Sequence, residues 1–229
     1  MAGRAETVGL TDRQVVHEVL SERSNRYLAR QMCWVMTIEG METYIVVPRD
    51  PADVELLVET VRPAPTPMDL DCVIGVYGPI ASPSMCGLAV PIVAFDQIYS
   101  FDRDSLLNAI PRPEKVTAKD FSPVAAEVFD RIMQLTDNAG ATDEHRALNY
   151  LAVRYQAIYA AAAAAFARNA SITSVEVVRS RLSVTRTVVD VIFAFTDRAT
   201  DVTDKSFVRV DVTEEYPFLV TKLSPYYDR

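Results

Sequence analysis

Residues 188–195 read Val-Val-Asp-Val-Ile-Phe-Ala-Phe, and this short stretch does most to decide the fold class. Valine and phenylalanine occupy every second position, which is the period of a β-strand with one face packed against a core. The same alternation returns at residues 208–212, and further apolar runs lie at 172–178 and 218–223. These four segments are therefore predicted to form a C-terminal antiparallel meander.

Two helices are predicted upstream of the meander, at about 123–136 and 142–168. The first follows Ser122-Pro123, a dipeptide that favours a helix start. The second has apolar residues at spacings of three and four, from Leu148 through Ile158 to Ala162. One face of this second helix should therefore lie in the core.

The N-terminal half is predicted to begin with a hairpin over residues 31–47, with its turn at Glu39-Gly40. Asp50-Pro51 then supplies a helix cap and a first helical proline, so a helix should follow to about Val61. Apolar runs at 69–77 and 88–95 are typical of strands covered on both faces.

Strands, then helices, then strands indicate an α+β fold with mixed sheet elements. We expect residues 1–24 to form a tail with a short helix. We expect residues 25–229 to form a single domain.

Composition excludes several classes of function. The chain has 23 basic and 31 acidic residues, a net charge of −8, and neither half is basic. Nucleic acids and anionic membrane surfaces bind concentrated positive charge, so neither is an expected partner.

No apolar stretch approaches the roughly 20 residues of a membrane span, and the charged first twenty residues do not resemble a signal peptide. We expect a cytoplasmic protein.

Standard catalytic signatures are missing. The sequence has no Gly-Lys-Ser/Thr phosphate loop and no Gly-x-Ser-x-Gly elbow, and its histidines are His17 and His145. His145, followed by Arg146, lies in the first turn of the second predicted helix. One interpretation of His145 is a catalytic base or a metal ligand. The other is a residue that only packs at the start of the helix. With Asp96 and Asp102, on a predicted loop over 96–104, these residues are the candidate catalytic set.

The chain has three cysteines, Cys33, Cys72 and Cys86. So small and odd a number does not predict a disulfide framework. Cys33, Cys86 and His145 could together bind zinc, with the fourth position open or supplied by a partner. The alternative is that these three side chains are unrelated. No other cofactor is expected.

Several unusual strings resemble one family. The chain is similar to the C-terminal domain of unknown function of PatG and PatA, which process cyanobactin precursor peptides. The resemblance covers nearly all of residues 25–229 and rests on these strings: Arg30-Gln-Met-Cys-Trp-Val35, Pro48-Arg-Asp-Pro-Ala-Asp53, Asp96-Gln-Ile-Tyr-Ser-Phe-Asp102, Ile110-Pro-Arg-Pro-Glu-Lys115, Thr136-Asp-Asn-Ala-Gly-Ala-Thr-Asp-Glu-His-Arg-Ala-Leu-Asn-Tyr150 and Leu223-Ser-Pro-Tyr-Tyr-Asp-Arg229.

The resemblance implies a place in ribosomal peptide maturation, beside a subtilisin-like protease and a precursor peptide. It brings no catalytic residue, because none is assigned in the family's domain. We therefore expect a non-catalytic binding or assembly module, acting as a homodimer, that engages the precursor peptide or a processing enzyme. The alternative is a peptide-tailoring enzyme with a pocket around His145, Arg146 and the 96–104 segment.

Overall fold

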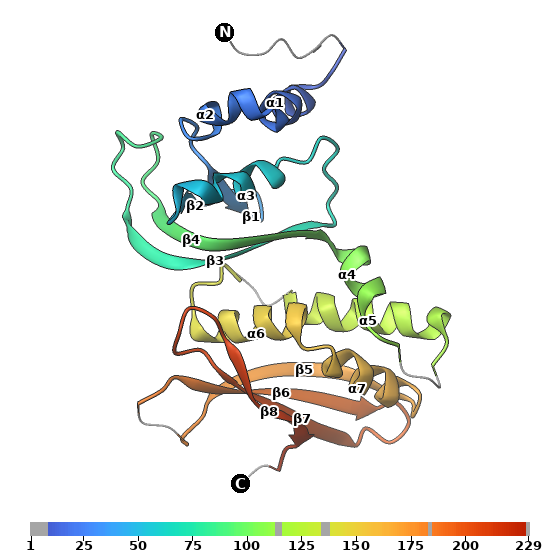
Figure 1. The fold of residues 1–229 in the computed structure, drawn as a ribbon. Helices are drawn as coiled ribbons and strands as arrows, with labels where there is room; N and C mark the ends of the chain where they lie inside the picture. Colours follow the sequence, from blue (N-terminus) through green and yellow to red (C-terminus); the bar gives the residue numbers. More distant parts are fainter. Residues whose placement is uncertain (1–8, 113–115, 134–137, 183–184, 228–229) are drawn as a thin grey trace. The chain divides into compact units, whose positions relative to one another are not determined.

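A computed structural model describes residues 9–112, 116–133, 138–182 and 185–227. The chain forms two compact units, Met1–Arg103 and Asp104–Arg229, called unit 1 and unit 2 below (Figure 1). Each unit has its own four-stranded sheet. The single domain expected over 25–229 stays a prediction.

In unit 1, two short α-helices and a 3₁₀ turn precede the sheet. Its elements are α1 (Asp12–Ser21), the 3₁₀ turn η1 (Arg23–Asn25), α2 (Arg26–Ala29), β1 (Val35–Ile38), β2 (Met41–Pro48), η2 (Pro51–Asp53), α3 (Val54–Glu59), β3 (Asp69–Ile80) and β4 (Pro91–Asp102). The strand order is β1-β2-β4-β3, with β2 parallel to β4 and the other pairs antiparallel. The mixed sheet was therefore predicted correctly.

Local signals in unit 1 act as the sequence indicates. Glu39 and Gly40 both have left-handed φ angles, 52° and 82°, as a two-residue hairpin turn requires. The Asp50 carboxylate accepts the N–H of Ala52 at 2.8 Å and caps η2, which leads directly into α3.

The 96–104 segment is not a loop. β4 continues through Asp102, and α4 (Arg103–Ala109) begins immediately after it. The strand is longer than predicted because β3 also continues to Ile80 and pairs with it along most of its length. Asp96 and Asp102 are therefore strand residues.

Unit 2 contains the predicted meander. Its remaining elements are α5 (Ala118–Met133), α6 (Asp143–Arg154), α7 (Ala157–Phe166), β5 (Ala170–Arg179), β6 (Val188–Asp197), β7 (Thr203–Asp211) and β8 (Phe218–Pro225). The four strands pair antiparallel in sequence order, and the helices cover one face of the sheet (Figure 1). The core includes these side chains, each at most 2% exposed: Leu148, Leu151, Ile158, Val191, Phe193, Val208 and Val210.

Both predicted helices of unit 2 exist, with different bounds. The 123–136 helix begins earlier, at Ala118, and includes Pro123. The 142–168 helix is broken at Tyr155, whose backbone angles of −111° and 85° are not helical. Its second part, α7, packs its alanine-rich sequence against α5 inside unit 2, so that run does not by itself argue for a dimer. In the described part of the chain, no helix is long and apolar enough to cross a membrane.

Candidate functional site

The candidate carboxylates lie in unit 1. Asp96 accepts a hydrogen bond from the guanidinium of Arg49 at 2.7 Å, and both side chains are partly exposed. Asp102 ends β4 opposite Asp69, the first residue of β3. An exposed ion pair such as Arg49–Asp96 contributes about 0–1 kcal/mol, so this contact positions side chains more than it stabilises the fold.

Arg146, the strongest cationic candidate, is engaged within unit 2. Its guanidinium donates to the carbonyl of Val212 at 2.7 Å, to that of Glu215 at 3.2 Å and to that of Glu214. Asp143 lies 3.6 Å away on the same helix. Arginine offers five donors in a fixed fork, and here they hold the segment after β7 against the first turn of α6.

His145 lies in the first turn of α6, next to Arg146. Its backbone N–H donates to the Thr142 hydroxyl at 3.2 Å, which caps the helix. The imidazole Nδ1 is shielded from solvent and has no hydrogen-bond partner among the described residues. His145 therefore keeps one ring nitrogen without an assigned role.

The cysteine prediction needs correction. Cys33 and Cys86 form a disulfide, with Cα atoms 5.8 Å apart and a sequence separation of 53 residues. Zinc binds thiolates, and the sulfurs of this bond are not thiolates. The predicted zinc site with His145 is thus incompatible with the oxidised pair, and the described residues contain no group of three or more His, Cys, Asp or Glu arranged for a metal.

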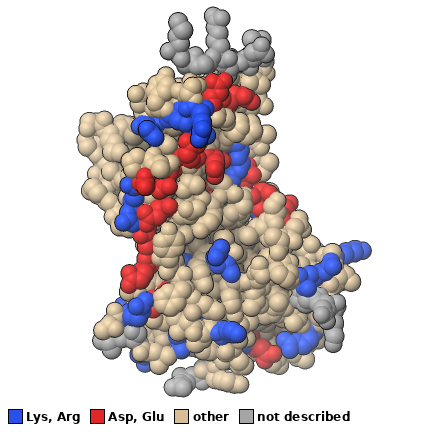
Figure 2. Space-filling view, viewed as in Figure 1, with Lys and Arg blue, Asp and Glu red and all other residues tan. Residues whose placement is uncertain are grey.

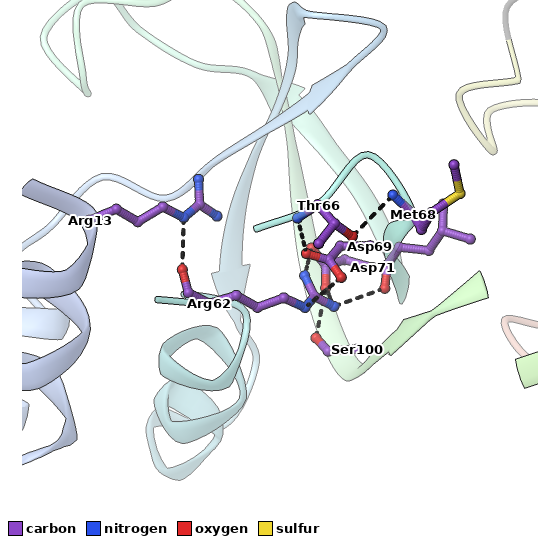
Figure 3. Close-up of polar contacts among 8 residues, drawn as sticks. Arg13, Arg62, Thr66, Met68, Asp69, Asp71 and Ser100 are labelled. Carbon is purple, nitrogen blue, oxygen red and sulfur yellow. Dashed lines mark hydrogen bonds and ion pairs between the residues drawn. The ribbon is translucent and has the colours of Figure 1, made fainter. Parts of the chain in front are cut away.

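Sequence reasoning missed the densest polar network of unit 1, which is centred on Arg62 (Figure 3). The Arg62 guanidinium lies 3.1 Å from Asp71 and 3.7 Å from Asp69, and donates to the Leu70 carbonyl at 3.2 Å. The Ser100 hydroxyl on β4 donates to Asp71 at 2.7 Å. The Arg62 carbonyl in turn accepts a hydrogen bond from Arg13 of α1 at 3.0 Å.

This network joins α1, the segment that follows α3, and the β3–β4 pair. Arg62 is 20% exposed and Asp69 13%, so both charges are largely removed from water and depend on each other. The available signal was the spacing of Asp69 and Asp71, which puts two carboxylates on the same side of a strand. The arrangement connects these parts of unit 1. It also engages the Arg62 guanidinium with Asp69, Asp71 and the Leu70 carbonyl.

Charges of both signs are interspersed on the face of the molecule in Figure 2. In unit 1, several acidic side chains form ion pairs with arginine, including Arg26–Glu55 at 2.7 Å and Arg49–Asp96. Each such pair offsets acidic charge locally.

Comparison with protein families gives a match to the PatG C-terminal family over residues 115–226, just under half of the chain. This region is similar to a PatG C-terminal domain. This PatG C-terminal region runs from α5 to β8, so it contains His145 and Arg146. Cys33, Cys86, Asp96 and Asp102 lie outside it. No curated protein matches the chain.

A solved structure described as the PatG domain of unknown function has the same fold. The two structures superpose with a TM-score of 0.70 at 19% sequence identity, and the match covers 94% of this chain and 87% of the other. The likeness therefore extends beyond the PatG C-terminal region to the mixed sheet of unit 1. The resemblance inferred from the sequence is confirmed.

Proposed function

We propose that the chain is a non-catalytic binding or assembly module of cyanobactin-like peptide biosynthesis. It engages the precursor peptide or a subtilisin-like processing protease, and so raises the local concentration of substrate at the processing enzyme. The observation that carries the proposal is the PatG C-terminal match over residues 115–226. The cytoplasm as compartment and a homodimeric state are parts of the same proposal.

The contacts of the candidate side chains support a binding role over a chemical one. Arg146 donates to three backbone carbonyls, and Asp96 is paired with Arg49. A catalytic group must be free to reach substrate, whereas these two side chains already have partners in the fold.

The alternative, a peptide-tailoring enzyme, is favoured by one observation at His145. Its shielded Nδ1 has no partner among the described residues, and histidine is the commonest general base in enzymes. A proton acceptor at this position would act on a peptide bound near the start of α6.

One experiment separates the two functions. The purified chain is titrated with the precursor peptide, and the mixture is then followed by intact-mass analysis. Binding with no change in peptide mass supports the module. A mass change that is lost in His145→Ala and kept in Arg154→Ala, an exposed residue of the same helix, establishes the enzyme instead.

If the peptide neither binds nor changes in mass, the next experiment tests whether the chain binds the processing protease instead. Purified processing protease is mixed with the chain, and the size of the complex is measured by light scattering. A stable complex supports an assembly role, while a mixture of free components in both experiments overturns the proposal. The same measurement on the chain alone reports whether it is a homodimer.

A further inference from the structure

The Cys33–Cys86 disulfide joins two parts of unit 1 that no backbone hydrogen bond of the described chain links. Cys33 lies two residues before β1, and Cys86 lies in the segment 81–90 between β3 and β4. β1 and β3 are the two opposite edges of the sheet. Val35 pairs with Ile45, which pairs with Ile92 near the start of β4, so the bond crosses one end of the sheet.

Apart from the disulfide, the 81–90 segment is held by hydrogen bonds within itself. Its hydrogen bonds within the described chain stay inside the segment: Ala81 to Val90 at 2.9 Å, Met85 to Ser82 at 2.7 Å and Gly87 to Pro83 at 3.1 Å. Cys86 has a left-handed φ of 64°, and Gly87 follows with 71°. A left-handed conformation is unfavourable for a residue with a side chain and persists where the surroundings enforce it. The covalent bond at Cys86 is one such constraint.

The bond is also accessible. Cys33 is exposed and Cys86 is partly exposed, and accessible disulfides are the ones that thiols exchange readily. In reducing compartments, disulfides of this kind are usually transient and redox-sensing.

Cys72, on β3, is the natural internal reference. It is a free thiol, and burial raises its pKa, so little of it is present as the reactive thiolate. A thiol reagent should therefore distinguish Cys72 from Cys33 and Cys86 in the folded, reduced protein.

We propose that Cys33 and Cys86 form a reversible thiol–disulfide switch that fixes or releases the 81–90 segment. A small thiol such as glutathione, as thiolate, attacks the exposed Cys33 sulfur, and Cys86 leaves as a thiolate that takes up a proton. A second glutathione thiolate attacks the mixed disulfide and frees Cys33. One oxidised glutathione is formed, and the two electrons pass to the cysteines. This inference does not depend on the proposed binding role, and only its reducing setting rests on the cytoplasmic compartment proposed above.

Counting reactive thiols tests the chemistry on the full chain. Protein prepared without reductant should take up one maleimide in denaturant, at Cys72. After glutathione treatment under native conditions it should take up two rapidly, and the third only after unfolding. Three adducts without reductant would mean that the bond does not form. One adduct after native glutathione would mean that it is a permanent structural bond. Either result overturns the switch.

Hydrogen exchange tests the conformational part. Reduction should raise exchange in residues 81–90 several-fold and leave β6 in unit 2 unchanged. Cys33→Ser should show the fast exchange in both redox conditions, while Cys72→Ser should respond like the native chain. Equal exchange of residues 81–90 in the oxidised and reduced native protein would refute the proposal even if the thiol counts agree.

Discussion

The phenol oxygen of Tyr155 accepts a hydrogen bond from the backbone N–H of Leu223 at 2.9 Å. Tyr155 is the residue at which α6 ends, and Leu223 lies on the edge strand β8. Two residues later α7 begins, and the hydroxyl of Tyr159 within it donates to the Ala152 carbonyl at 2.6 Å. The break between the helices is therefore fixed by one contact to the sheet and one to the preceding helix.

Replacing Tyr155 with phenylalanine should destabilise unit 2. The change leaves the Leu223 N–H without its acceptor, which costs about 1–2 kcal/mol in the free energy of unfolding. Tyr150→Phe on α6 is the control, because the Tyr150 hydroxyl has no hydrogen bond among the described residues. Denaturant unfolding of the two variants measures the difference, and equal stabilities would show that the Tyr155 contact is not formed in solution.

Arg146→Ala should have a larger effect than any other arginine substitution on α6. It removes charge-assisted bonds to three carbonyls, and we expect a loss of about 3 kcal/mol, since hydrogen bonds to charged groups contribute more than neutral ones. Arg154→Ala, at the exposed end of the same helix, should change stability by less than about 0.5 kcal/mol. If the Arg146 variant keeps full stability and loses only peptide binding, the guanidinium is a binding residue and not a clamp.

Acid stability should depend on Asp211. The Arg186 guanidinium donates to this buried carboxylate and lowers its pKa from 3.8 to about 2. The unfolded chain therefore takes up this proton first as the pH falls. The stabilisation is present above about pH 3.8 and is lost between that value and about 2. Urea midpoints measured across this range should fall less steeply in Asp211→Asn than in the native chain.

Arg186→Gln tests the same pH dependence from the partner of Asp211. It should make the urea midpoint fall less steeply between about pH 3.8 and 2, because removing the main cause of the lowered pKa brings the pKa of folded Asp211 closer to that of the unfolded chain. Arg179→Gln is the matched control, since Arg179 is exposed and has no ion pair within the described residues. Identical acid profiles for the two arginine variants would contradict the assignment.

The fold could be predicted where its causes are local. The Glu39-Gly40 turn, the Asp50 cap and the alternation in β6 and β7 each act over a few residues, and each was predicted. The break at Tyr155 was not, because the contact that fixes it comes from Leu223, 68 positions away.

The same reason limits what could be predicted of the site. Cys33 and Cys86 were grouped by residue type, yet only the topology of the sheet shows that they meet each other. Arg62 was missed because no motif marks it: its guanidinium contacts β3 at Asp69, Leu70 and Asp71, and its carbonyl accepts from Arg13 of α1, 49 positions away. Arg146 was identified, but its carbonyl partners lie 66 to 69 positions away, so its structural role was not visible.

Gly75→Ala should disrupt the pairing of β3 with β4. Gly75 lies at the irregularity in their register, and a Cβ there would stand 2.5 Å from the Ala94 carbonyl oxygen and 2.7 Å from the Phe95 Cα. Both are backbone atoms of β4, which cannot move aside as a side chain can, so we expect a loss of about 2–3 kcal/mol. Gly78→Ala is the control three residues along the same strand, where the nearest atoms are 3.4 Å away in ordinary contact. Thermal unfolding of the two variants should separate them by several degrees, and a Gly75 variant as stable as the Gly78 variant would show that the strands do not approach this closely.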